Sequence, residues 1–294
     1  MSASLLETVL AHGELPFLHL FFRCWRLPEI FLLGRLSFRL RCIVYYYCSK
    51  VWSVPHFLGR WFPSPDAALR LLGTAPAIVC GASVMQFFDR AYMEETRLDI
   101  CVDFGGLLEV GQFLLSQGYQ FKPGPSAPIK DFELAALVEV SHFSAQRRMT
   151  ADRSFSQQHH DSRILKFSRT LIFDDSGVSR TLIVLVHLVR CELHRFVFAM
   201  HSTALMNYID GEHAVSVFAR SAFVVRRSFI ACQEAVPGSD AAMTEYSEWL
   251  SQYHDRYAPM EIIGTSAQVY PEAECGRRWI GDTRCWIIPC RYDR

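Results

Sequence analysis

One short segment constrains the fold of this chain more than any other, because it places two buried strands around a glycine turn and a helix. The apolar run 75–80 has the length and composition of a buried strand. Gly81–Ser83 is predicted to form the turn, with Ser83 capping a helix over 84–90. The run 98–104 is predicted to be the next strand. This order indicates a mixed sheet with helices packed on it.

The rest of the central region continues this alternation, with a polar stretch at 146–163 predicted to be an exposed loop. The further predicted elements are a helix over 107–117 ended by Gly118, a strand at 119–121, paired strands at 164–173 and 181–188 around the turn Asp174–Gly177, a short helix over 204–209 capped by Ser202-Thr203, and a helix over 241–258. The predicted core comprises Ile78, Val79, Phe87, Phe88, Leu98, Ile100, Val102, Ile183, Leu185 and Phe198.

Residues 1–60 have the character of short helices rather than strands. Pro16 and Pro28 stand where helices begin. Apolar residues recur at steps of three and four and predict one stripe along a helix that something must cover. The stripe consists of Leu32, Leu33, Leu36, Leu40 and Val44.

Charge and cysteine content narrow the classes of function. Thirty basic residues balance thirty acidic ones, so the whole chain offers no electrostatic support for nucleic-acid binding. Ten cysteines without a C-x-x-C pair indicate buried thiols in a reducing compartment, and the N-terminus does not resemble a signal peptide. The most apolar stretches are interrupted by arginines, which argues against a membrane span. The expectation is an intracellular protein, cytoplasmic or nuclear.

The glycine turn followed by an acidic strand resembles the nucleotidyltransferase superfamily, in which Gly-Ser opens a helix and D-x-D follows on the next strand. The resemblance implies that Gly81 and Ser83 hold a nucleotide or another anion at the helix N-terminus. It also implies Mg²⁺ held by paired carboxylates that point to one face of the strand.

The acidic strand departs from that pattern at the first carboxylate position, which is Arg97. Asp99 is then the only candidate catalytic residue, because Asp103 would lie roughly 13 Å from it along the strand. The strand expected to carry a third acid, 181–186, has none. The sequence therefore predicts no metal site. The alternative structural interpretation is that Gly81 and Ser83 are only a turn and a cap and that Asp99 pairs with Arg97 or another nearby donor.

A narrower resemblance covers about residues 70–230. The stretches Ile78–Arg90, Leu98–Val102 and His201–Asn207 are similar to motifs of an uncharacterised fungal protein family. His201 precedes a predicted capped helix, where it could meet an anion; the alternative is a histidine packed at a strand end.

The N-terminal segment resembles an F-box, the helical module that docks on the Skp1 adaptor of ubiquitin ligases. The resemblance rests on Leu15-Pro16, Leu27-Pro28 and the helix predicted from Leu32 to Val44. It implies that residues 13–48 present Leu32, Leu36 and Leu40 to a Skp1-like partner. The alternative is a helical extension packed on the main domain.

These observations predict an α+β (mixed α/β) chain with a helical N-terminal segment followed by a nucleotidyltransferase-like mixed sheet with flanking helices. The expected domains are a helical, F-box-like segment at 1–60, the core at 61–235, and a C-terminal helix and tail at 236–294. The favoured function is that of a degenerate, non-catalytic nucleotidyltransferase that acts as an interaction protein or adaptor, without a cofactor. The alternative is a metal-dependent nucleotidyltransferase, which would use Mg²⁺ with a nucleoside triphosphate. Neither hydrolase nor zinc-site spacing is present.

Overall fold

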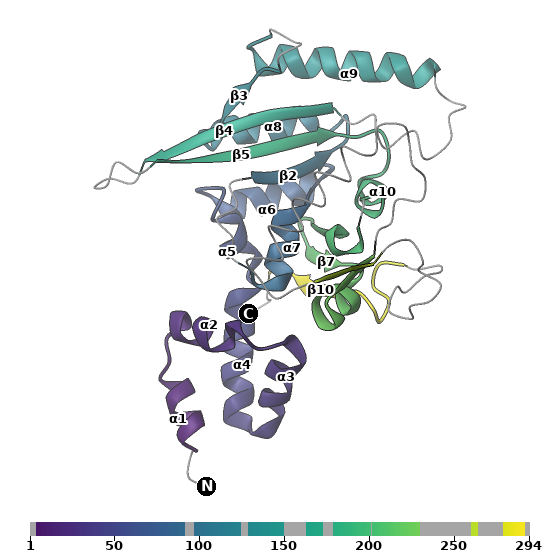
Figure 1. Ribbon diagram of the computed structural model, residues 1–294. Coiled ribbons are helices and arrows are strands. Elements are labelled where there is room, and N and C mark those ends of the chain that lie inside the picture. The colour runs from purple at the N-terminus through teal and green to yellow at the C-terminus, as the bar shows by residue number, and fades with distance from the viewer. Residues whose placement is uncertain are drawn as a thin grey trace.

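A helical N-terminal region precedes an eight-stranded mixed sheet with helices packed on it, so the expected α+β class is confirmed (Figure 1). The computed structural model describes residues 4–91, 97–124, 129–149, 163–172, 179–200, 202–229, 260–263 and 279–291. The predicted turn Asp174–Gly177, His201 and the predicted helix at 241–258 lie outside these ranges. None of the helices in the described ranges is long and apolar enough to cross a membrane.

The helices follow the chain from the N-terminal region into the sheet. They are α1 (Leu5–Ala11), α2 (Leu15–Arg23), α3 (Leu27–Leu36), α4 (Phe38–Val51), α5 (Val54–Leu58), α6 (Pro65–Thr74), α7 (Ala82–Asp89), α8 (Leu107–Ser116), α9 (Phe132–Met149) and α10 (Leu193–Phe198), with a 3-10 turn η2 (Thr203–Leu205) and a π-helical turn η3 (Arg220–Val225). Pro16 and Pro28 lie in the first turns of α2 and α3, as predicted.

The large sheet has the order β10-β7-β6-β1-β2-β5-β4-β3. Its strands are β1 (Ala77–Cys80), β2 (Arg97–Val102), β3 (Gln120–Lys122), β4 (Arg163–Ile172), β5 (Ser179–Leu188), β6 (Asn207–Ile209), β7 (His213–Ser216) and β10 (Trp286–Pro289). A second, two-stranded sheet joins β8 (Arg227–Phe229) to β9 (Glu261–Ile263). The pairing of β1 with β2 confirms that the two strands of the glycine-turn segment are neighbours. Strand β2 then runs parallel to β5, which forms the predicted hairpin with β4.

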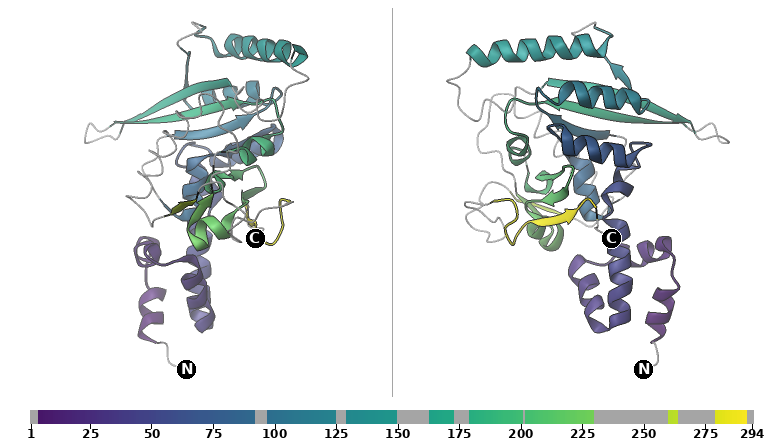
Figure 2. Two further views of the ribbon diagram at one scale, coloured as in Figure 1. Left: turned by 45° about the vertical axis from the view of Figure 1, so that its right-hand side comes forward. Right: turned by 180° about the vertical axis from the view of Figure 1, so that it is seen from behind.

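The two faces of the large sheet are covered differently. Leu98, Ile100 and Val102 of β2 pack into the main core with α6 and α8, which lie in front of the sheet when it is seen from behind (Figure 2, right). On the opposite face, α10 covers β1 and β6, with Val197 packed among Ile78, Cys80 and Tyr208. Helix α10 also contacts β2, and its Phe196 ring lies 5.7 Å from the His187 ring at the end of β5. The rest of that face, formed by β5, β4 and β3, carries no described helix and faces the viewer in Figure 1.

The N-terminal helices form a lobe below the sheet (Figure 1). Hydrogen bonds of Arg90 and Trp52 join this lobe to α7. Arg90 ends α7 in the left-handed conformation, at φ +57°. Its guanidinium donates to the carbonyl of Trp25 at 2.9 Å and to that of Phe22 at 3.3 Å. The Trp52 indole donates to the carbonyl of Phe88 at 3.2 Å. The two Arg90 bonds are charge-assisted and partly buried, the Trp52 bond is neutral and buried, and together they fix the lobe against α7.

The prediction of one apolar stripe from Leu32 to Val44 was wrong, because Ser37 interrupts it. Ser37 is extended, and its hydroxyl accepts from the Leu40 amide at 3.2 Å, so that a new helix begins. The helical phase is reset there: Leu40 is 4 % exposed, whereas Leu32 and Leu36 are 57 % and 74 % exposed.

The predicted helix at 204–209 was also wrong. Only the 3-10 turn η2 forms there, and Tyr208 and Ile209 pair with β1 because aromatic and β-branched residues suit a strand. Phe198, predicted to be buried, ends α10 and is exposed, while Ile183 and Leu185 are half-buried because they lie on the open face of the sheet. The other seven predicted core residues are buried.

Two close contacts hold the elements around the sheet together. The turn between β6 and β7 brings Gly211 against Gly73 near the end of α6. Asp89, at the end of α7, forms a short ion pair with Arg226, which follows η3. Both side chains of this pair are largely buried.

Candidate functional site

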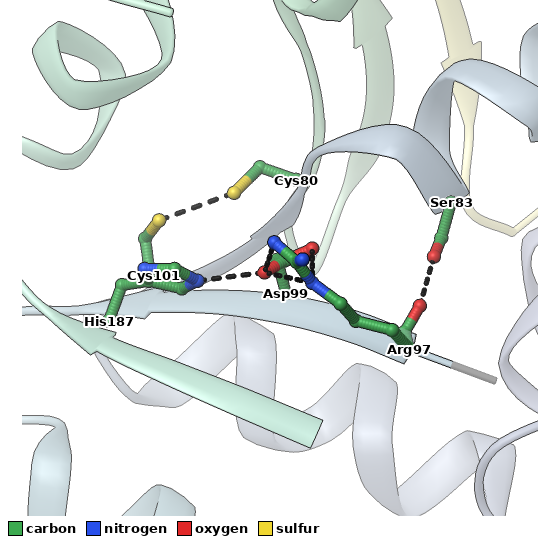
Figure 3. Close-up of polar contacts among 6 residues, drawn as sticks. All are labelled: Cys80, Ser83, Arg97, Asp99, Cys101 and His187. Carbon is green, nitrogen blue, oxygen red and sulfur yellow. Dashed lines mark hydrogen bonds and ion pairs between the residues drawn. The ribbon is translucent and has the colours of Figure 1, made fainter. Parts of the chain in front are cut away.

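Strand β2 places Arg97, Asp99 and Cys101 on one face of the sheet, because side chains alternate along a strand. The parallel register of β5 brings His187 opposite Cys101, on the same face. Figure 3 shows the resulting cluster, with Arg97 and His187 on either side of the Asp99 carboxylate.

Asp99 is buried, and both of its oxygens have partners. The Arg97 Nε lies 3.2 Å from each carboxylate oxygen, and Arg97 Nη2 lies 3.1 Å from Oδ1. His187 Nε2 lies 2.8 Å from Oδ1. Gly81 is required beside this group, since its φ is +82° and a Cβ there would lie 3.0 Å from Oδ2. The carboxylate is therefore enclosed by two cationic or hydrogen-bonding partners and the glycine turn.

The electrostatics of Asp99 are dominated by this enclosure. Burial raises the pKa of Asp99, but the hydrogen bond and charge of His187, together with Arg97, outweigh it and hold the pKa below its ordinary value. The carboxylate is thus ionised at neutral pH, and its charge is already compensated within the protein.

Ser83 does not cap α7, contrary to prediction. The helix begins at Ala82 with Gly81 as its N-cap, and Ser83 donates to the carbonyl of Arg97 at 2.6 Å (Figure 3). A serine inside the first turn can reach back to a neighbouring strand, which joins α7 to β2. Gly81 and Ser83 therefore both lie against the Arg97–Asp99 pair, whereas His201 lies outside the described residues.

Two thiols lie beside the ion network. Cys80 Sγ and Cys101 Sγ are 3.2 Å apart on the paired strands β1 and β2, and both residues are buried (Figure 3). Burial, reinforced by Cys80 and by the charge of Asp99, raises the pKa of Cys101 well above its ordinary value. Since the thiolate is the reactive form, this environment disfavours a nucleophilic role.

Within the described residues, no group of three or more His, Cys, Asp or Glu side chains is placed so that it could hold a metal ion. His187 of β5 lies 2.8 Å from Asp99, and no local sequence pattern singled it out. The parallel pairing of β2 with β5 was the signal needed to find His187.

Comparison with protein-family models, curated protein sequences and solved structures found no significant match. The site consists of one compensated carboxylate, a half-exposed guanidinium and a buried imidazole at the border between the covered and open parts of a sheet face.

Proposed function

We propose that the chain is a non-catalytic protein with a nucleotidyltransferase-like core, in which an ion network replaces the metal-binding carboxylates. One observation carries the proposal: Asp99, the single carboxylate of the cluster, is bound by both Arg97 and His187. The glycine turn against Asp99 and the order of β1, α7 and β2 support the resemblance to the superfamily, and the motifs within residues 70–230 support the resemblance to the fungal family.

The chemistry of two-metal catalysis argues against activity at this cluster. Two divalent cations roughly 4 Å apart need several carboxylates that bridge or flank them. Here a guanidinium lies 3.1 Å from Asp99, the one carboxylate that the described residues bring to this cluster, and it would repel a divalent cation. The alternative, a metal-dependent nucleotidyltransferase, requires Arg97 to leave Asp99.

Isothermal titration and turnover assays with the four nucleoside triphosphates, with and without Mg²⁺, separate the two functions. The proposal expects no turnover under any of these conditions. Mg²⁺-dependent turnover that disappears in the Asp99→Ala variant would establish the alternative.

We expect a metal site to form when Arg97 and His187, the two partners of Asp99, are both replaced by carboxylates. In the double variant Arg97→Asp, His187→Asp, three acids would share one sheet face. Mn²⁺ titration should then give saturable binding that the wild-type protein lacks. At a free Mn²⁺ concentration about a hundred times the dissociation constant, Mn²⁺ should raise the free energy of unfolding of the double variant by about 2.7 kcal/mol.

The control is the double variant Arg35→Asp, His56→Asp, which makes the same change of charge at two exposed positions on α3 and α5. Saturable Mn²⁺ binding by this control, or by the wild-type protein, would mean that the Asp99 cluster is not a degenerate metal site.

A second candidate function, a ubiquitin-ligase adaptor, is favoured by the exposed apolar side chains of the N-terminal lobe. Leu32 and Leu36 face solvent on α3. Other exposed apolar residues within 13–48 are Phe17, Leu20, Phe31, Phe38, Tyr45 and Tyr46. A surface with this many exposed large apolar groups is typical of a protein contact.

Co-purification with Skp1 tests the adaptor function. We expect the full chain to retain Skp1 and the double variant Leu32→Asp, Leu36→Asp to lose it at least tenfold, since both leucines would be buried in such a contact. Leu40 is left unchanged, because it is part of the core. The control is Leu5→Asp, at an even more exposed leucine outside residues 13–48. A wild-type chain that never co-purifies with Skp1 rules the adaptor function out.

A further inference from the structure

Two lysines lie directly opposite one another on the open face of the sheet. Lys122 of β3 pairs with Lys166 of β4, and both are exposed. Directly paired residues of neighbouring strands share a face. The same row continues through Leu185 of β5 to Asp99 of β2, so the lysines and the ion network lie on one face.

This arrangement is unfavourable for the protein alone. Like charges directly opposite each other on neighbouring strands destabilise a sheet. The Lys122 ammonium group donates a hydrogen bond to the Gln120 side chain at 3.1 Å, and this neutral amide does not compensate the lysine charge. Among the described residues of β2, β3, β4 and β5 whose side chains share this face, Asp99 is the only carboxylate, and it is bound to Arg97 and His187.

Arg97 adds a third cation to the same face. Its side chain is 48 % exposed although it is bound to Asp99. The strand spacing and the offset of two residues place its Cα roughly 12 Å from that of Lys166. Long Lys and Arg side chains can converge on one ligand across such a span. Hydroxyl-bearing Ser168 and Thr181 lie on the same face, near Arg97.

We propose that Lys122, Lys166 and Arg97, the cationic strip, bind a linear polyphosphate group without a divalent cation. The group is either the triphosphate of a nucleotide or an inorganic polyphosphate. This inference rests on the proposed function, because it requires that this face of the sheet binds its ligand without a divalent cation. The fixed cations supply the positive charge that Mg²⁺ would otherwise bring, and Mg²⁺ should weaken binding because it neutralises the ligand.

Isothermal titration of the full chain with inorganic tripolyphosphate and with ATP, both in EDTA, tests this inference. We expect binding that weakens when Mg²⁺ or salt is added. Lys122→Gln and Lys166→Gln should each weaken it about threefold to fivefold, as expected for an exposed ion pair. Lys50→Gln on α4 is the matched control and should leave the affinity unchanged. Equal affinities for the two probes assign a free polyphosphate, and tighter binding of ATP assigns a nucleotide.

The variant Lys166→Glu separates loss of binding from loss of folding. It replaces a repulsive pair by an attractive Lys122–Glu pair, so its thermal midpoint without ligand should rise. Its affinity for tripolyphosphate should fall at least tenfold, because the strip loses a cation and gains an anion. Loss of binding together with gained stability cannot result from unfolding.

The outcomes that overturn the inference differ from those that overturn the proposed function. No binding to either probe, or binding unchanged in Lys166→Glu, rejects the cationic strip alone. A glutamate peptide of equal charge that binds as tightly as tripolyphosphate also rejects it, in favour of an acidic protein partner. Binding only with Mg²⁺, followed by turnover, rejects the proposed function.

Discussion

Replacing Gly211 with alanine is expected to lower the free energy of unfolding by about 2–3 kcal/mol, the upper range for forcing atoms into a packed site. A Cβ at this position would lie 2.3 Å from the Gly73 Cα and 2.4 Å from the Gly73 nitrogen. Both are backbone atoms of α6, so relief requires the helix and the β6–β7 turn to separate. Urea unfolding of the two proteins measures the difference.

Gly73→Ala is the matched control, because it adds a methyl group on the other side of the same contact. Its Cβ would lie 3.8 Å from the Gly211 Cα, an ordinary contact distance. Alanine is favoured over glycine within a helix by up to about 1 kcal/mol. The control should therefore be neutral or stabilising. Equal losses of stability in both variants would mean that the close approach of the two backbones is not the cause of the loss in Gly211→Ala.

Replacing Arg226 with methionine is expected to have the largest effect, about 3–5 kcal/mol, because it leaves a buried carboxylate without its main cation. Burial raises the pKa of Asp89, and the charge and hydrogen bond of Arg226 oppose that rise. Without Arg226 the pKa of Asp89 should rise further. Thermal and urea unfolding at neutral pH give the size of the loss.

The pH dependence of this variant identifies the cause. A carboxyl group whose pKa is higher in the folded than in the unfolded state reduces stability as pH rises above its unfolded value, about 3.9. The unfolded state is the same in both proteins, so the difference from wild type should begin to grow as pH passes the wild-type pKa of Asp89, which burial already raises, and should level off above the higher pKa of Asp89 in the variant. The double variant Asp89→Leu, Arg226→Met has no buried charge at either position and should recover most of the loss. A deficit independent of pH would assign the effect to lost packing.

Local sequence patterns were sufficient for the elements that depend on neighbouring residues. Strand β1, the glycine turn, α7 and β2 follow from apolar runs and a glycine at positive φ. The β4–β5 hairpin follows from two apolar runs around a turn. The break at Ser37 was missed because a three- and four-residue spacing continues across it, and only the extended conformation of Ser37 shows that the helical phase restarts.

The part of the site that the sequence did not predict depends on long-range pairing. Arg97 and Asp99 lie two residues apart, and their pairing was among the expectations from the sequence. His187 reaches Asp99 only because β5 lies parallel to β2, and no local pattern encodes that register. Lys122 and Lys166 become neighbours in the same way, through the pairing of β3 with β4. Strand β10 was missed because its partner, β7, is also distant in sequence.

The parallel pairing of β2 with β5 also sets the time at which the Asp99 cluster can form during synthesis. Asp99 and His187 are separated by 88 residues. At translation rates of about 5–20 residues/s, β2 leaves the ribosome roughly 4–18 s before its partner strand. During that interval β1, α7 and β2 can fold together, but one edge of β2 has no strand to pair with. A nascent chain at this stage exposes the unpaired edge of β2 and the Asp99 carboxylate, which is buried in the complete fold. We expect the chain to need chaperones most at this stage.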